Sequence, residues 1–197
     1  MSRVTKYKFW YVVVLLALGS VLVSYSILAQ PKRGAVLALI LILLIPGRVQ
    51  GLLFRDLFRG RRALDRGDPM LALSHLKEFL ATVRAQPWRK PLLWLSWSFY
   101  TPDVEAMALN NIGTAQLALG NDGAAEAAWR EALDLDPQYP IPHANLALIA
   151  AARSDSSSAS QHLEAARRLG YSGAGLDRFA HKAQTILAAV ESHGPAA

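Results

Sequence analysis

An uncharged stretch of twenty-one residues near the start constrains this chain more than any other feature. It covers residues 9–29, and only Ser20, Ser24 and Ser26 within it are plainly polar. About 20 consecutive apolar residues are enough for a helix to cross the hydrocarbon core of a bilayer. The stretch therefore predicts a transmembrane helix over residues 9–29.

A second apolar run follows almost at once. Pro31 breaks the first helix, and Lys32 and Arg33 can extend their charges toward water or phosphate. The next run is uncharged from residue 35 to residue 47, and it reaches residue 54 only past Arg48 and Gln50. These features predict a transmembrane hairpin over residues 1–54, with spans at about 9–29 and 35–54.

The charges beside these runs predict the orientation of the hairpin. Three basic residues precede the first run and six lie between positions 48 and 66, whereas the connecting turn has only two. Because basic residues remain on the cytoplasmic side, both termini are expected in the cytoplasm of a bacterial-type inner membrane. A cleaved signal peptide is the alternative, but the first run is long for one and the second run would remain.

The overall positive charge of +6 has the same uneven distribution. Residues 1–66 carry eleven Lys or Arg against two Asp or Glu, while residues 67–197 carry ten against thirteen. Basic charge confined to the apolar end indicates membrane orientation and argues against nucleic-acid binding. The arginines after the hairpin either contact anionic lipid headgroups or serve orientation alone; they include Arg55, Arg59, Arg61 and Arg62.

The second half of the chain repeats itself with a period of 34 residues. Residues 111–113 (NIG) recur as residues 145–147 (NLA), and a set of small and large apolar residues recurs at the same spacing: Ala125, Trp129 and Ala132 match Ala159, Leu163 and Ala166. This period and these residues resemble the tetratricopeptide repeat family. The best unit is 106–139, where Leu109, Ile112, Gly113, Ala125, Trp129, Ala132 and Pro137 fit the family pattern and Gln116 departs from it.

The resemblance implies an all-α fold. In this fold the N-terminal two-helix transmembrane hairpin is followed by a short right-handed stack of helix pairs with a C-terminal capping helix. The repeats would occupy residues 106–139 and 140–173 of a 103–197 domain, and residues 174–192 would form the capping helix. Within the best unit, small residues at Gly113 and Ala125 would let the two helices approach, with Trp129 filling the space between them.

Residues 55–102 predict an imperfect first repeat. Gly67, Asp68 and Pro69 combine a helix stop, an N-cap and a proline at the first helical position. Residues 85–102 form an insertion in which five of the seventeen aromatic residues fall within positions 88–100. This insertion would lie in the membrane interface or pack on protein, and its candidate interface residues are Trp88, Arg89, Lys90, Trp94, Trp97 and Tyr100.

Members of the tetratricopeptide family commonly bind an extended peptide along the face lined by the first helix of each pair. Carried over to this sequence, the resemblance implies a groove of Met107, Asn110, Asn111, Thr114, Leu117, Ile141, Ala144, Asn145 and Leu148. Asn111 and Asn145 would hydrogen-bond a peptide backbone or, as an alternative, serve the repeat internally.

The sequence carries no pattern that predicts chemistry. The absence of cysteine excludes disulfides and thiolate sites, and no phosphate loop, dinucleotide fingerprint or nucleophile turn occurs. The five histidines are scattered, with His75 and His162 at equivalent places on the second helices. We therefore expect no enzyme activity, no cofactor and no metal site.

These observations favour a membrane-anchored adaptor or scaffold that binds protein partners on the cytoplasmic side. The alternative is an accessory structural subunit of a larger membrane complex, held mainly through its transmembrane hairpin. Expected partners are therefore protein and membrane lipid, not nucleic acid.

Overall fold

The computed structural model describes residues 3–28, 51–90 and 101–171; within the first range, the side chains at positions 3–5, 7, 8, 11, 15, 22 and 26–28 are not described. These residues form helices and no strand, which confirms the all-α class. Most of the second predicted span, the aromatics at positions 91–100 and the predicted capping helix 174–192 lie outside the described residues. The helices are α1 (Arg3–Leu28), α3 (Arg55–Asp65), α4 (Pro69–Ala85), α5 (Val104–Ala118), α6 (Asp122–Leu135), α7 (Pro140–Ala152) and α8 (Ser156–Arg168).

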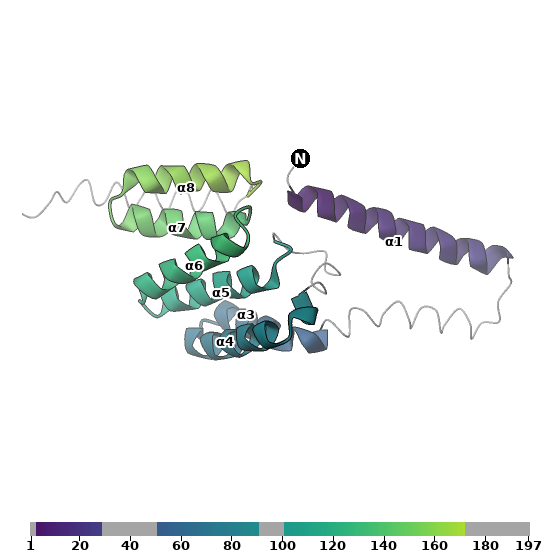
Figure 1. The fold of residues 1–197 in the computed structure, drawn as a ribbon, viewed down its shortest axis with the longest axis horizontal. Helices are drawn as coiled ribbons and strands as arrows, with labels where there is room; N and C mark the ends of the chain where they lie inside the picture. The colour runs from purple at the N-terminus through teal and green to yellow at the C-terminus, as the bar shows by residue number, and fades with distance from the viewer. Residues whose placement is uncertain (1–2, 29–50, 91–100, 172–197) are drawn as a thin grey trace, which may run out of the picture.

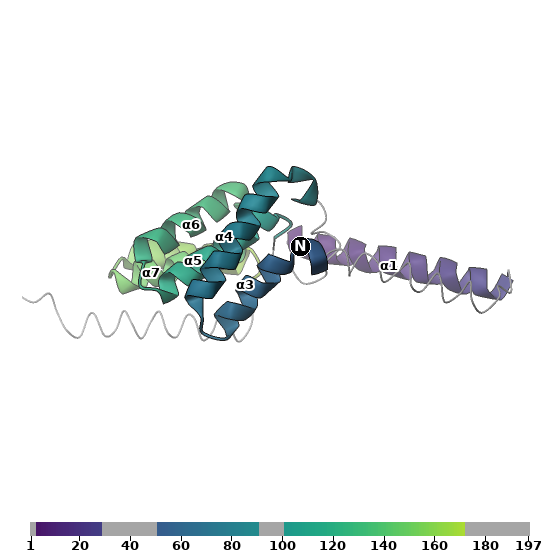
Figure 2. The ribbon, with the colours of Figure 1, turned by 90° about the horizontal axis from the view of Figure 1, so that it is seen from below.

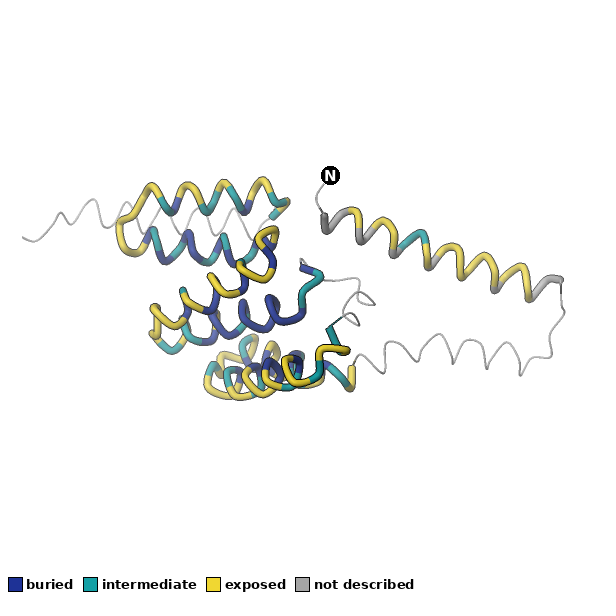
Figure 3. Tube along the Cα trace, viewed as in Figure 1, coloured by how far each residue is buried: buried dark blue, intermediate teal, exposed yellow. Residues whose placement is uncertain are grey.

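Helix α1 contains residues 9–28 of the first predicted span and lies apart from the other helices (Figures 1 and 2). Its described large apolar side chains are mostly exposed: Leu16 and Val21 have 66% and 67% of their surface accessible (Figure 3). Within residues 3–28, 51–90 and 101–171, no helix is both long and apolar enough to cross a membrane.

The remaining six helices form a stack of three helix pairs, α3 with α4, α5 with α6, and α7 with α8 (Figure 1). Each pair also packs on the next one, α4 against α5 and α6 against α7. Helix α5 lies in the middle of the stack, and ten of its residues are buried (Figure 3).

All three pairs use the same turn between their helices. Gly67, Gly120 and Ser154 occupy the left-handed region with φ of 77°, 76° and 62°. In each turn the next residue donates its backbone N–H to the carbonyl five positions earlier, as in Asp68 to Ala63 at 2.9 Å. This arrangement is a Schellman motif, and it ends the first helix of each pair. The left-handed position in the motif favours glycine, which has no Cβ, and disfavours most other residues.

Ser154 should therefore be the strained member of this set. Because a non-glycine residue costs about 1–2 kcal/mol in the left-handed region, we expect Ser154→Gly to stabilise the stack by about 0.5–1 kcal/mol after the extra chain entropy of glycine is included. The reverse change, Gly120→Ser, should destabilise it by about 1 kcal/mol. Urea unfolding followed by circular dichroism measures both, and a destabilised Ser154→Gly variant would contradict the assignment.

Aspartates begin three of the helices. The side chains of Asp68, Asp103 and Asp155 accept backbone N–H groups three residues later, at 3.0, 2.9 and 3.0 Å. The predicted stop, cap and proline at residues 67–69 are thus confirmed. An N-cap of this kind satisfies one of the unpaired donors in the first helical turn.

Small residues let the helices of a pair approach closely. A Cβ atom added at Gly113 would lie 2.7 Å from Cδ1 of Trp129, and one added at Gly60 would lie 2.6 Å from Cγ of Leu76. Both pairs of residues are sixteen positions apart. The predicted close approach at Gly113 with Trp129 filling the space is therefore confirmed, and the first pair uses the same device.

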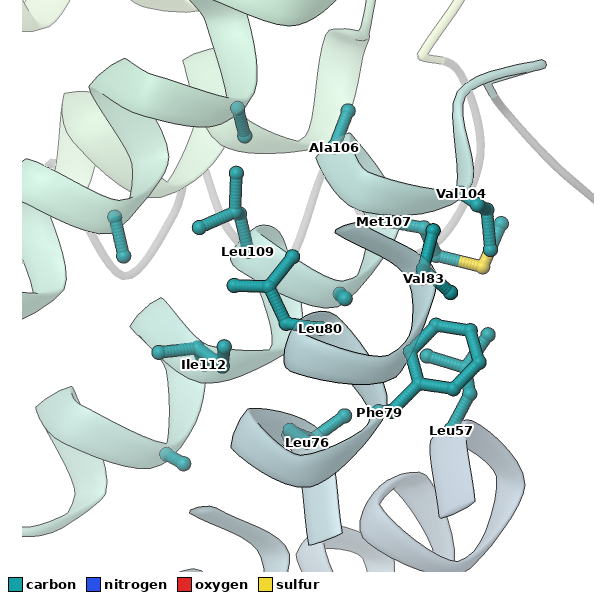
Figure 4. Close-up of a cluster of buried hydrophobic side chains, with 14 of the residues drawn as sticks. Leu57, Leu76, Phe79, Leu80, Val83, Val104, Ala106, Met107, Leu109 and Ile112 are labelled. Atoms are coloured by element: carbon teal, nitrogen blue, oxygen red, sulfur yellow. The ribbon is translucent and has the colours of Figure 1, made fainter. Parts of the chain in front are cut away.

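The largest buried cluster joins the first and second helix pairs. Figure 4 shows side chains of α3, α4 and α5 meeting between the helices, including Leu57, Phe79, Val83 and Leu109. Phe79 also packs edge-on against Phe54, with ring centroids 5.8 Å apart. Phe54 directly precedes α3, so this contact ties the start of the stack to its core.

Candidate functional site

The residues of the predicted groove lie on α5 and α7, the first helices of the second and third pairs. Of the nine, only Thr114 is exposed. Five are partly accessible: Asn111, Leu117, Ile141, Asn145 and Leu148. The remaining three are buried: Met107, Asn110 and Ala144.

Asn110 connects three helices. Its side-chain oxygen accepts a hydrogen bond from Nδ2 of Asn145 at 3.0 Å, which joins α5 to α7. Its backbone carbonyl accepts from Nε1 of Trp129 on α6 at 3.0 Å and from Oγ1 of Thr114 at 3.1 Å. The sequence left two alternatives open for Asn111 and Asn145, and in this structure Asn145 has the internal one. Oδ1 of Asn111 accepts from Nδ2 of Asn110 at 3.5 Å.

Glu105 of α5 is a buried carboxylate that links α5 to α4 and to the residues that follow α4. Glu105 is only 5% exposed, and it forms ion pairs with Arg84 at 3.1 Å and with Lys90. Burial alone would raise the pKa of Glu105, but the hydrogen bonds and charges of Lys90 and Arg84 lower it below its usual value. Arg84 also pairs with Glu131 of α6, so the network spans three helices.

The predicted interface residues differ in how the structure places them. Arg55, Arg59, Arg61 and Arg62 on α3 are exposed, and Trp88 is 58% exposed with the Arg89 guanidinium 5.5 Å from its ring centroid. Arg89 and Lys90 are half-buried, and Arg89 donates to the carbonyl of Leu53 at 3.4 Å. Trp94, Trp97 and Tyr100 lie outside the described residues.

A small polar pocket of about 170 Å³ opens between α6, α7 and α8. Glu126 on its wall pairs with Arg130 at 2.7 Å and with Arg153 at 2.5 Å. These two arginines, Arg130 first, lower the pKa of the Glu126 carboxyl below its usual value. Both arginines of the pocket wall are therefore paired with the same carboxylate, Glu126.

His162 lines this pocket and meets His143 on α7. Their Nδ1 atoms lie 3.1 Å apart, so one neutral imidazole can donate to the other. Burial lowers the pKa of both histidines, although the backbone carbonyl of Pro137 partly opposes this for His143. The charge of His143 lowers the pKa of His162 further. Around His162, Arg130 acts in the same direction, whereas Glu126 and Asp155 oppose it.

The histidine contact should make the last helix pair sensitive to acid. A folded pKa below the unfolded value of 6.5 means that the unfolded chain binds more protons, so this contribution to stability is present above pH 6.5 and is lost as the pH falls below it. We expect the melting temperature to fall between pH 7 and about pH 5. The double variant His143→Leu with His162→Ala, which copies Leu109 and Ala128 of the second pair, should remove this part of the pH dependence. An unchanged pH profile in that variant would contradict the assignment.

The sequence missed contacts whose partners lie on different helices. It placed His75 and His162 at equivalent positions but did not identify their partners, which are Asp56 and His143. The spacing could have indicated these partners, because 87 positions separate Asp56 from His143 and the same number separates His75 from His162. The two contacts therefore join equivalent positions in the first and third helix pairs. The Glu105 network had no such signal, because the residue 34 positions after Glu105 is Tyr139, so the carboxylate does not recur at the repeat spacing.

The geometry defines residues 51–90 and 101–171 as a tandem stack of three helix pairs, with polar contacts that join one helix to another. No family model, curated protein or solved structure matches the chain.

Proposed function

We propose that this chain is a membrane-anchored scaffold that binds a protein partner along the first helices of a tetratricopeptide-like stack. One observation carries the proposal: three successive helix pairs share one turn geometry, with left-handed residues at Gly67, Gly120 and Ser154. Repeated pairs of this kind build an extended face suited to a peptide or a helix of a partner. A binding role also accords with the absence of any chemical motif in the sequence.

The candidate binding face combines apolar and polar atoms. Leu117, Ile141 and Leu148 are partly accessible, and the exposed Thr114 lies among them on α5. The Asn110–Asn145 hydrogen bond holds α5 and α7 in register, which keeps this face preorganised. Preorganisation lowers the entropic cost of binding and so favours recognition of a flexible segment.

The proposed anchor is the apolar N-terminal region, with the stack on the cytoplasmic side. Support comes from the uncharged residues 9–29, from the basic residues on both sides of the hairpin, and from the exposed Leu16, Leu18 and Val21 of α1. Large apolar side chains exposed together on one helix need a nonaqueous partner. Lipid is the partner that the neighbouring charges favour.

The test is affinity purification from membranes in mild detergent. Thr114→Arg and Leu148→Arg place a bulky charge on the candidate face, and we expect each to reduce recovery of the partner at least ~10-fold. Ala127→Arg is the matched control, because Ala127 is exposed on α6, a second helix. Loss in the control but not in the face variants would refute a binding role for this face.

The alternative function is an accessory subunit held through its N-terminal region. The exposed apolar side chains of α1 favour this reading, because they could also pack on another membrane protein. Replacing residues 1–54 by an unrelated anchor separates the two functions. A scaffold keeps its partner after the exchange, whereas an accessory subunit loses it.

A further inference from the structure

The outer side of the first helix pair brings three metal-ligating side chains together. Asp56 comes from α3, and His75 and Glu78 come from one face of α4 at a spacing of three residues. Their ligand atoms all lie within 4.8 Å of one another, and this is the one group of its kind among the described residues. Histidine with two carboxylates is a donor set that divalent transition metals accept.

The contact between Asp56 and His75 is not a hydrogen bond. Oδ1 of Asp56 lies 3.6 Å from Nδ1 of His75, and that nitrogen is buried without a hydrogen-bond partner within the described part of the chain. A buried polar atom left in this state is costly and calls for an explanation. Two ligands at about 2.1 Å from a tetrahedral metal lie roughly 3.4 Å apart, which is close to the observed separation.

We propose that Asp56, His75 and Glu78 bind a divalent transition-metal cation such as Zn²⁺. The cation would bridge Nδ1 of His75 and Oδ1 of Asp56, satisfying the buried nitrogen. The exposed Glu78 carboxylate would close on it as the third ligand, and water would complete the coordination. This would fasten α3 to α4 at the start of the stack.

Two arginines share the neighbourhood of Asp56. Arg55 and Arg59 lie 3.8 and 3.7 Å from its Oδ1, and their side chains are 58% and 49% exposed. Ion pairs as long and exposed as these contribute little to stability. Both arginine side chains are therefore able to turn toward water when a cation binds. They therefore do not prevent access to the carboxylate.

Comparison with the other helix pairs shows what is special about the first. The positions equivalent to Asp56, His75 and Glu78 are occupied by other residues in these pairs. They are Leu109, Ala128 and Glu131 in the second pair and His143, His162 and Ala165 in the third. The second pair has one donor, and it pairs with Arg84. The third pair has two donors in contact but lacks the carboxylate. The first pair alone offers three donors.

The experiment is equilibrium dialysis of the full chain, without a histidine tag, in detergent micelles against Zn²⁺. We expect saturable binding of one Zn²⁺ per chain, with His75→Ala weakening the affinity at least ~100-fold and Glu78→Gln at least ~10-fold. The control is His162→Ala, at the equivalent place in the third pair, which should bind within about two-fold of the unmodified chain.

Three results would overturn the proposal. The first is an absence of saturable uptake by the unmodified chain, and the second is uptake that His162→Ala removes and His75→Ala does not. The third is unchanged affinity in Glu78→Gln, a variant that keeps its fold because Glu78 is exposed. Circular dichroism of each variant separates loss of binding from loss of folding.

Discussion

Replacing Trp129 with alanine should cost the stack about 3–5 kcal/mol of unfolding free energy, the largest effect of any single truncation. Trp129 is only 1% exposed and packs with Ala125, Leu146 and Ile149, so it joins the second helix pair to the third. Its Nε1 also donates to the carbonyl of Asn110 at 3.0 Å. Truncation removes the ring, opens a cavity and leaves that carbonyl with one donor fewer.

Denaturant unfolding followed by circular dichroism measures this cost, with two companion variants. Trp129→Phe keeps most of the ring but loses the Nε1 donor, so we expect a smaller loss of about 1–2 kcal/mol. Trp88→Ala removes a tryptophan that is 58% exposed and should change stability by no more than about 0.5 kcal/mol. Equal losses for Trp88→Ala and Trp129→Ala would show that Trp129 does not occupy the centre of the stack.

Gly113→Val should destabilise the stack by about 3 kcal/mol for the opposite reason, which is overpacking. The added Cβ would lie 2.7 Å from Cδ1 and from Cε2 of Trp129, and the indole is buried and hydrogen-bonded, so it cannot move aside easily. Valine forces α5 and α6 apart. The variant Gly60→Ala adds only one methyl group and should cost less than Gly113→Val, but it should still destabilise the stack because its Cβ would lie 2.6 Å from Cγ of the buried Leu76.

Gly123→Ala is the matched control for the glycine variants. Gly123 lies in the first turn of α6 with nothing within 4 Å of an added Cβ. Alanine favours helix over glycine by about 1 kcal/mol, so this variant should be unchanged or slightly stabilised. The same unfolding experiment compares the variants, and a Gly113→Val variant as stable as Gly123→Ala would disprove the close approach.

The sequence predicted those parts of the fold that depend on local rules or on the repeat. Gly67, Asp68 and Pro69 marked a helix boundary because each has a backbone preference of its own. Gly113 and Trp129 identified the close approach of two helices because a small residue and a large one recur at repeat spacing. Ser154 was not identified as a left-handed residue because serine has no preference for that conformation, although it lies 34 positions after Gly120 and so occupies the equivalent turn position.

Much of the candidate site depended on contacts between helices, which a single sequence does not display. Asn110 and Asn145 were placed on the same face, but the hydrogen bond between them depends on how α5 and α7 pack. For the same reason the sequence analysis assigned no role to Asp56, whose carboxylate lies 3.6 Å from Nδ1 of His75. The helical period determines which side chains of one helix lie on the same face. Contacts between two helices also depend on the angle and distance at which the helices cross.

The most direct test of the account is thiol labelling of single cysteines in intact membranes. The chain has no cysteine, so Leu18→Cys in α1 and Ala127→Cys in α6 each introduce one reporter. A maleimide reacts with the thiolate, which forms in water and not in the hydrocarbon core. We predict that Ala127→Cys reacts at least ~100-fold faster than Leu18→Cys, and that denaturation in detergent makes the two rates equal. Equal labelling rates before denaturation would contradict an N-terminal anchor in lipid beneath a helical stack in water.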